Sequence, residues 1–151
     1  MNIFKKIFSF FVSISLVLFF TLPIQSKVVG DTIVLGAAVS LTGKYSTNGE
    51  HTKNGYNMAV QRINDMGGVT VGGKSYKLDI IYYDDESDSG RAAQLAERLI
   101  KQDGVQFMLG PYSSGLTKAM APVTEENQIP MVEANGASRS LFTKGYKYLF
   151  A

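Results

Sequence analysis

The chain has 151 residues, 45% of them hydrophobic and 19% charged, a composition typical of one folded domain and not of a disordered segment. The formal net charge is +2, but Lys5 and Lys6 belong to an N-terminal segment that we expect to be removed. Without these two, the basic residues fall from 15 to 13 and equal the 13 acidic ones, which argues against nucleic acid as a partner. The sequence contains no cysteine, which excludes disulfides and a lipid-modified cysteine.

The first 26 residues have the pattern of a secretory signal peptide. Lys5 and Lys6 precede an uncharged apolar run at residues 7–22, Pro23 ends the run, and Ser26 offers a small residue for cleavage. The alternative is a membrane anchor, but a run of 16 residues is shorter than the ~20 residues that span a bilayer comfortably. We therefore expect a cleaved signal over residues 1–26 and a periplasmic location.

Apolar runs of strand length recur along residues 27–151. The polar residues 40–49 are predicted to form a loop, and Gly72-Gly73 is predicted to be the turn of a hairpin that begins at residues 69–71. Nearly continuous apolar runs are typical of buried parallel strands. The predicted strands are residues 31–39, 74–83, 105–109 and 129–134, and a fifth begins at residues 146–150.

Three segments between these strands carry apolar residues at helical spacing. Gly67-Gly68 is expected to end the first helix, Asp88 or Ser89 to cap the second, and Pro122 to kink or end the third. Strands that alternate with helices predict an α/β fold, a three-layer parallel sheet with helices on both faces. The helical residues are Tyr56, Ala59, Val60 and Ile63, then Ala92, Leu95, Ala96 and Leu99, then Leu116, Ala119, Met120 and Val123.

Two short loops of small residues each lie where a predicted strand ends and a helix is expected to begin. They are residues 110–115, Gly-Pro-Tyr-Ser-Ser-Gly, and residues 135–138, Asn-Gly-Ala-Ser. Ligands of open α/β sheets bind outside the carboxyl ends of the strands, and free N–H groups at a helix start attract anions. We therefore expect the two loops to hold a small carboxylate ligand together.

The sequence fits an enzyme less well than it fits a ligand-binding protein. Ser113 and Ser114 could be nucleophiles, but the single histidine, His51, lies at the start of the first predicted helix, and no G-x-S-x-G motif is present. The acidic residues at 84–88 could bind Mg²⁺ in an α/β enzyme, but no carboxylate is expected at the other strand ends, so a solvated acidic turn is preferred. Neither glycine-rich nucleotide motif occurs. We expect no enzyme activity, no cofactor and no metal.

Five segments, taken together, resemble the type I class of periplasmic substrate-binding proteins and, within it, the leucine/isoleucine/valine-binding family. The resemblance implies that residues 27–151 are the incomplete N-terminal lobe of a two-lobed protein that closes on its ligand. It also implies that the ligand is passed to an inner-membrane ABC permease for uptake. The segments are residues 33–43 (IVLGAAVSLTG), 63–69 (INDMGGV), 81–85 (IYYDD), 110–117 (GPYSSGLT) and 129–138 (IPMVEANGAS).

The resemblance also implies which residues bind the ligand. Ser114 and the hydroxyl of Ser138 would hold the α-carboxylate of an amino acid together with nearby backbone N–H groups. The carbonyl of Gly136 would accept a hydrogen bond from the ammonium group. The full set of expected ligand-binding residues is Tyr45, Asn48, Tyr112, Ser113, Ser114, Gly136, Ala137 and Ser138.

One position departs from the pattern of the family. Where branched-chain amino-acid binders place an aromatic residue of the first loop on the ligand, this chain has Asn48, with Tyr45 three residues earlier. The departure opens the site to a polar amino acid, an amide or a urea-like ligand. An alternative function on the same fold is the ligand-sensing extracellular domain of a receptor or regulator.

Overall fold

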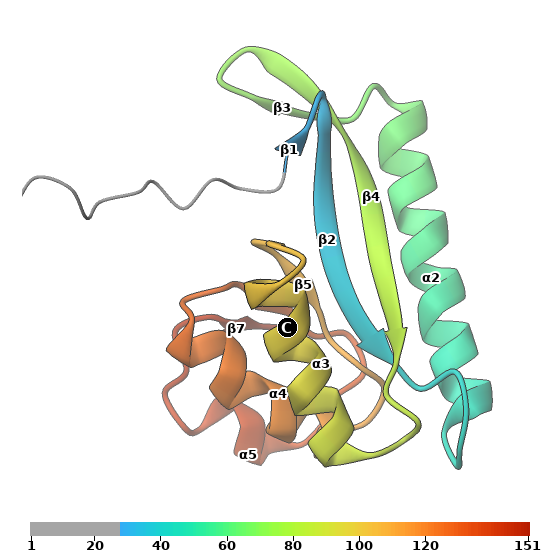
Figure 1. Ribbon diagram of the computed structural model, residues 1–151, viewed down its shortest axis with the longest axis vertical. Helices are drawn as coiled ribbons and strands as arrows, with labels where there is room; N and C mark the ends of the chain where they lie inside the picture. The colour runs from blue at the N-terminus through green and yellow to red at the C-terminus, as the bar shows by residue number, and fades with distance from the viewer. Residues whose placement is uncertain (1–27) are drawn as a thin grey trace, which may run out of the picture.

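The computed structural model describes residues 28–151, which form a seven-stranded sheet with helices on both of its faces (Figure 1). The predicted signal peptide, residues 1–26, lies outside the described residues. The strands are β1 (Val28–Val29), β2 (Thr32–Val39), β3 (Val69–Val71), β4 (Lys74–Asp84), β5 (Met108–Leu109), β6 (Met131–Val132) and β7 (Leu149–Phe150). The helices are α2 (Ser46–Asp65), α3 (Ser89–Lys101), α4 (Ser114–Glu126) and α5 (Arg139–Phe142).

The strand order is β3-β4-β2-β5-β6-β7, with β1 paired to β2 beside this path. Strand β2 is parallel to both of its main neighbours, β4 and β5, and the pairs β5–β6 and β6–β7 are parallel as well. Among the described strands, the antiparallel pairs are β1–β2 and the hairpin β3–β4. The predicted α/β fold with a parallel sheet is confirmed.

Local signals in the sequence explain where several elements begin and end. Gly72 and Gly73 have φ of +58° and +82°, which a tight hairpin turn requires and which glycine adopts at little cost. At the end of α2, Gly68 donates its N–H to the carbonyl of Ile63, and Gly67 has a φ of +106°. Asp88 caps α3 by accepting the backbone N–H of Arg91 at 2.7 Å.

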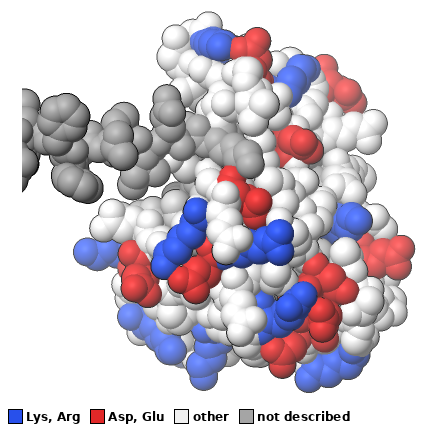
Figure 2. All heavy atoms as spheres, viewed as in Figure 1, with Lys and Arg blue, Asp and Glu red and all other residues white. Residues whose placement is uncertain are grey.

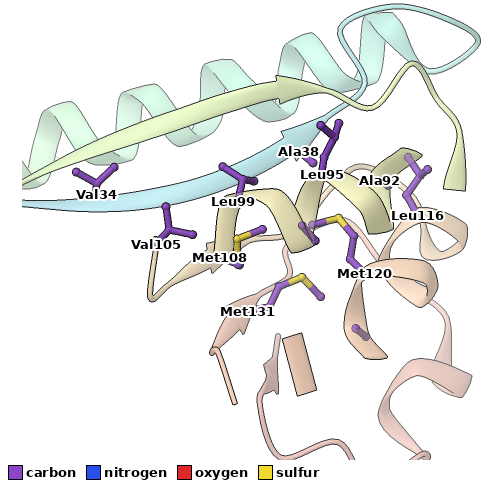
Figure 3. Close-up of a cluster of buried hydrophobic side chains, with 12 residues drawn as sticks. Val34, Ala38, Ala92, Leu95, Leu99, Val105, Met108, Leu116, Met120 and Met131 are labelled. Carbon is purple, nitrogen blue, oxygen red and sulfur yellow. The ribbon is translucent and has the colours of Figure 1, made fainter. Parts of the chain in front are cut away.

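The main hydrophobic core lies between β2 and the helices α3 and α4 (Figure 3). Val34 and Ala38 of β2 lie in one cluster with Leu95 and Leu99 of α3, while α2 contacts β2 and β4 on the other face. Burying a large aliphatic side chain contributes roughly 1.5–3 kcal/mol, so this cluster is a main source of stability for the domain. The remaining members of the cluster are Ala92, Ala96, Val105, Met108, Leu116, Met120, Ala121 and Met131.

The strands β5 and β6 are shorter than the sequence predicts. On β2, strand β1 pairs with Thr32 and Ile33, and β5 pairs with Gly36 and Ala37. Strand β6 begins at Met131 because Pro130 has no N–H to donate to a ladder. The outer residues of the predicted strands 105–109 and 129–134 are therefore irregular.

Helix α2 begins earlier than predicted. Residues 46–49 were expected in a loop, because Asn48 and Gly49 favour helices weakly. In the structure, Gly49 allows the first turn to lie on the end of β2, since a Cβ at this position would come within 1.8 Å of the Ser40 carbonyl oxygen. The predicted buried face is also wrong at Ala59, which is exposed, while Thr52 is buried instead.

Helix α4 continues through Pro122 to Glu126, so the proline does not end it. Pro122 and Lys118 are both exposed, and water can hydrate the Lys118 carbonyl that the proline leaves without a donor. Within residues 28–151, no helix combines the length and the apolar character needed to cross a membrane. Figure 2 shows acidic and basic side chains interspersed over one face of the molecule.

Candidate functional site

The candidate site lies where three loops leave the carboxyl ends of neighbouring parallel strands. These loops are residues 40–45 after β2, residues 110–113 after β5 and residues 133–138 after β6. The chain leaves β2 towards α2 on one face of the sheet and leaves β5 towards α4 on the other (Figure 1). The two connections therefore diverge between β2 and β5, and such a switch point is where open α/β sheets bind ligands.

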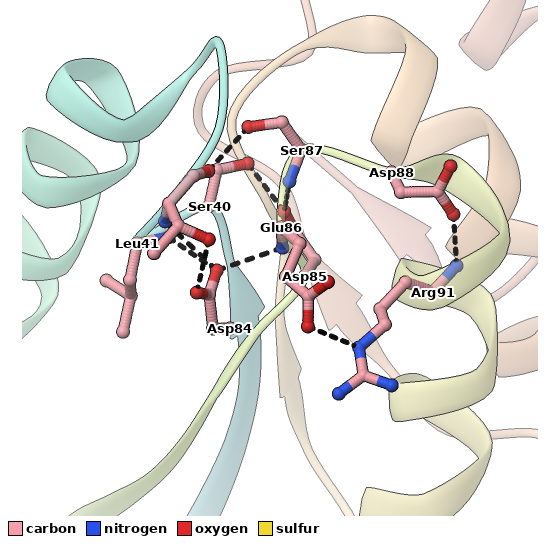
Figure 4. A network of polar contacts seen from close by, with 9 residues as sticks. Ser40, Leu41, Asp84, Asp85, Glu86, Ser87, Asp88 and Arg91 are labelled. Carbon is pink, nitrogen blue, oxygen red and sulfur yellow. Dashed lines mark hydrogen bonds and ion pairs between the residues drawn. The ribbon is translucent and has the colours of Figure 1, made fainter.

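The loop after β2 is held in place by the carboxylate of Asp84 at the end of β4 (Figure 4). Its Oδ1 accepts the N–H groups of Leu41 at 2.9 Å and of Thr42 at 3.1 Å, and its Oδ2 accepts the Thr42 hydroxyl at 2.7 Å. Burial by itself raises the pKa of Asp84, but hydrogen bonds from Thr42, Glu86 and Leu41 outweigh it and lower the pKa below its ordinary value.

The neighbouring carboxylate, Asp85, is fully buried. Its Oδ1 accepts the Ser40 hydroxyl at 2.6 Å and the Ser87 N–H at 2.8 Å, while its Oδ2 has no hydrogen-bond partner. Burial raises the pKa of Asp85 above its ordinary value. The prediction of a solvated acidic turn is therefore wrong at Asp85, because this side chain connects the ends of β2 and β4 inside the protein. In the described part of the chain, no group of three or more acidic, His or Cys side chains is arranged to hold a metal ion.

Tyr45 and Tyr112 come from different loops and meet at the switch point. Their ring centroids are 5.5 Å apart with an interplanar angle of 64°, an edge-to-face contact. Tyr45 also donates its N–H to the Ser87 hydroxyl at 3.0 Å, so the acidic turn fixes the backbone at this tyrosine. Both predicted site residues thus form one aromatic wall beside the loops.

The two serine loops are in direct contact, as the sequence analysis expected from their places at neighbouring strand ends. The backbone N–H of Ser138 donates to the Ser114 Oγ at 3.0 Å. The hydroxyl hydrogen of Ser114 stays available for a further acceptor, because Oγ acts only as acceptor in this contact. Ser113 precedes α4 with a φ of +82° and accepts the Leu116 N–H at 3.4 Å as the helix cap.

Glu133 is a site residue that the sequence analysis did not single out. It follows β6, is 3% exposed, and accepts the N–H groups of Asn135 and Gly136 on one carboxylate oxygen. The Thr117 hydroxyl of α4 donates to the other oxygen at 2.6 Å. Burial raises the pKa of Glu133, although these hydrogen bonds act in the opposite direction. The signal for it was present, since it is the single charged residue in the apolar run 129–134.

A pocket of about 390 Å³ opens between α2 and the loops after β5 and β6. Asn48 and Tyr112, both expected to bind the ligand, line this pocket. Tyr56, which the sequence predicted only as part of an apolar helix face, lines it as well. Tyr56 instead donates its hydroxyl to the Gly110 carbonyl at 2.7 Å, and burial raises its pKa. The other lining residues are His51, Thr52, Gly55, Ala134 and Asn135.

The remaining expected ligand-binding residues, Gly136, Ala137 and Ser138, lie in the loop after β6. Gly136 is buried and its N–H is used by Glu133, while Ala137 is exposed. The Ser138 hydroxyl is within 2.8 Å of the Ser140 hydroxyl at the start of α5. The site therefore presents two hydroxyl groups, Ser114 and Ser138, together with a pocket that Tyr112 lines in part.

The chain is similar to curated amino-acid-binding proteins. The leucine-, isoleucine-, valine-, threonine- and alanine-binding protein of Pseudomonas aeruginosa is 29% identical over 120 residues, which cover 80% of this chain and 31% of that protein. The chain spans about a third of the length of the curated relatives it matches.

Two solved structures show the same fold. The branched-chain amino acid transporter substrate binding protein of Streptococcus pneumoniae, in complex with isoleucine, matches with a TM-score of 0.71 and 29% identity over 79% of this chain and 33% of its own. A solute binding protein of an ABC transporter from R. palustris, in complex with 4-hydroxybenzoate, matches with a TM-score of 0.64 and 30% identity over 79% of this chain and 31% of its own. The model of the family described as periplasmic binding protein matches residues 32–151, and the chain therefore belongs to that family.

Proposed function

We propose that this chain is the N-terminal lobe of an exported solute-binding protein that captures an amino acid or a similar small carboxylate ligand for an ABC transporter. The observation that carries the proposal is the contact between Ser114 and the N–H of Ser138 at the start of α4. This contact brings two hydroxyl groups and the first N–H groups of a 13-residue helix to one edge of the sheet. That edge suits a carboxylate, because a helix N-terminus favours negative charge.

The expected strength of such a site is sufficient for capture at low concentration. Hydrogen bonds to a charged group contribute about 1.5–3 kcal/mol each. Three or four of them would supply much of the about −8 kcal/mol that micromolar affinity represents. The N–H of Ser138 also polarises the Ser114 hydroxyl, which strengthens the hydrogen bond that Ser114 can donate to the ligand.

The pocket beside the tyrosines supports a ligand whose remaining part is polar. Asn48, His51 and Thr52 of α2 line it with amide, imidazole and hydroxyl groups. A polar ligand side chain could form hydrogen bonds with the exposed Asn48 and His51, which a branched aliphatic side chain could not. We propose a polar amino acid, an amide or a urea-like compound as ligand, with the carboxylate at Ser114 where one is present.

Replacing Ser114 in the full-length protein tests the proposed site. Ser114→Ala removes one donor to the ligand carboxylate, so we expect affinity to fall tenfold or more, equivalent to at least about 1.4 kcal/mol. Isothermal titration calorimetry with serine, asparagine, leucine and 4-hydroxybenzoate would measure it. Ser75→Ala, on the β3–β4 hairpin, is the matched control and should bind like the parent protein. Equal affinity in the Ser114 variant would remove this residue from the site.

The proposal includes export and delivery. We propose that residues 1–26 are a signal peptide, that the mature protein acts in the periplasm, and that an inner-membrane ABC permease receives the ligand. The family match and the apolar run after Lys5 and Lys6 support this. Expression of the full-length gene followed by N-terminal sequencing of the periplasmic fraction should yield a chain that starts near Lys27. A chain that keeps Met1 and sediments with membranes would favour an anchor.

A further inference from the structure

We infer that Glu133 is a positioning residue, which fixes the two ligand loops in one geometry from a buried place between them. The inference rests on the proposed function, because it concerns how that site is held and not a second site. Glu133 does not contact the space where a ligand would bind, since its side chain is almost completely buried. Its effect on the ligand would therefore pass through the groups that it holds.

One carboxylate oxygen of Glu133 organises the loop after β6. It accepts two successive backbone N–H groups, those of Asn135 and Gly136, and so fixes the course of the chain directly after the strand. The next residues of this loop lead to Ser138, whose N–H reaches Ser114. A carboxylate that holds the beginning of the loop thus determines where Ser138 lies.

The other carboxylate oxygen acts on α4. It accepts the hydroxyl of Thr117, a buried residue in the first turn of the helix that carries Ser114. The same hydroxyl oxygen lies 2.9 Å from the carbonyl oxygen of Ser113, the helix cap. Glu133 therefore contacts the first turn of α4 directly, at the Thr117 side chain.

The packing around Glu133 is consistent with this role. A Cβ at Gly110, in the loop after β5, would lie 2.2 Å from the Glu133 Oε2, and one at Gly136 would lie 3.1 Å from its Cγ. Both loops therefore approach the Glu133 side chain at glycines, where no larger residue fits without displacement. The side chain fills the space between the loops and bonds to groups on both sides of it.

The number of hydrogen-bond donors around Glu133 shows whether its negative charge or only its shape is needed. Thr117 has one hydroxyl hydrogen and two oxygens within reach, those of Glu133 and Ser113, so it can donate to only one of them. An amide in place of the carboxylate would still accept from Asn135 and Gly136 and would donate to Thr117. Thr117 would then donate to Ser113. Glutamine therefore preserves the arrangement, whereas alanine abolishes it.

The test compares Glu133→Gln and Glu133→Ala in the full-length protein. With serine, asparagine, leucine and 4-hydroxybenzoate as probes, we expect the alanine variant to lose at least tenfold in affinity for each probe that the parent binds, and the glutamine variant to stay within about threefold of the parent. Glu126→Gln, at the exposed end of α4, is the control for loss of a carboxylate and should bind like the parent. A folded alanine variant with parental affinity would overturn the inference.

Amide hydrogen exchange supplies a readout that needs no ligand, so it also decides the case if the parent protein binds none of the compounds and the proposed function fails. In Glu133→Ala, exchange should accelerate at Asn135, Gly136 and, two residues further on, at Ser138. Exchange in the strands β2 and β4 should stay at the parental rate. Acceleration throughout the domain would show a general stabilising role instead, and unchanged exchange at Ser138 would show that Glu133 does not position it.

Discussion

At the scale of single residues, two adjacent carboxylates at the end of β4 have opposite electrostatic behaviour. The native state of Asp85 holds a proton more tightly than the unfolded chain, because burial raises its pKa. Stability from this group is therefore greatest at low pH and falls as the pH rises through the native pKa. Asp84, whose pKa is lowered, stabilises the fold above the ordinary carboxyl pKa and loses this contribution as the pH falls through its native value.

This contrast gives a prediction for a pair of isosteric variants. Asp85→Asn should flatten the decline in the free energy of unfolding as the pH rises through the raised native pKa of this carboxyl, since the buried group no longer ionises. Asp84→Asn should cost roughly 1–2 kcal/mol at pH 7, because the hydrogen bonds to a charged acceptor become bonds to a neutral one. Urea denaturation at several pH values would measure both. Parallel pH profiles for Asp85→Asn and the parent protein would contradict the assignment.

At the scale of elements, helix α2 is placed by a glycine near its start. Because a Cβ at Gly49 would overlap the Ser40 carbonyl oxygen, the helix could not lie on the end of β2 with any other residue there. The loop after β2, with Tyr45, lies between this contact and the acidic turn. The absence of a Cβ at Gly49 therefore determines how α2 and the loop with Tyr45 are placed.

Two glycine-to-alanine variants in α2 separate this contact from helix propensity. Gly49→Ala should destabilise the domain by about 1–3 kcal/mol, the range for overpacking. Gly55→Ala, which has no atom within 4 Å of its added Cβ, should stabilise the domain by up to about 1 kcal/mol, since alanine favours helices more than glycine does. Thermal unfolding of both variants would show the opposite signs. Stabilisation by Gly49→Ala would mean that α2 is not held against β2.

The sequence predicted the elements better than it predicted the supports of the site. Apolar spacing and turn residues depend on neighbours along the chain, which is why the helices, the hairpin at Gly72 and the parallel sheet could be expected. The contact of the two serine loops was also predictable, because parallel strands end at one edge of the sheet. The bond from Ser40 to Asp85 joins residues 45 positions apart and that from Thr117 to Glu133 joins residues 16 apart, and no local pattern encodes such pairs.

At the scale of the whole molecule, the sheet is covered unevenly. Helix α2 covers β2 and β4, whereas Leu109, Val132 and Phe150 stand in register on β5, β6 and β7. Val132 and Phe150 are each 51% exposed, and among the described strands β7 pairs with β6 alone. An apolar surface beside an open strand edge promotes association between chains.

We therefore predict that a purified polypeptide of residues 28–151 self-associates. The double variant Val132→Thr/Phe150→Thr should shift the population towards monomer, because it removes apolar surface while threonine, a β-branched residue, still favours the strands. Val71→Thr, which is 55% exposed on the β3–β4 hairpin, is the matched control and should associate like the parent. Sedimentation velocity over a range of concentrations would measure the distribution. A monomeric parent polypeptide would contradict the prediction.

The positive φ of Ser113 has a consequence for the energetics of the site. A side chain held at a φ of +82° costs the native state of the order of 1–3 kcal/mol, which glycine would avoid. The chain therefore stores conformational energy directly beside Ser114, at the first turn of α4. A ligand whose binding lets Ser113 adopt a common φ would recover this cost as additional binding free energy.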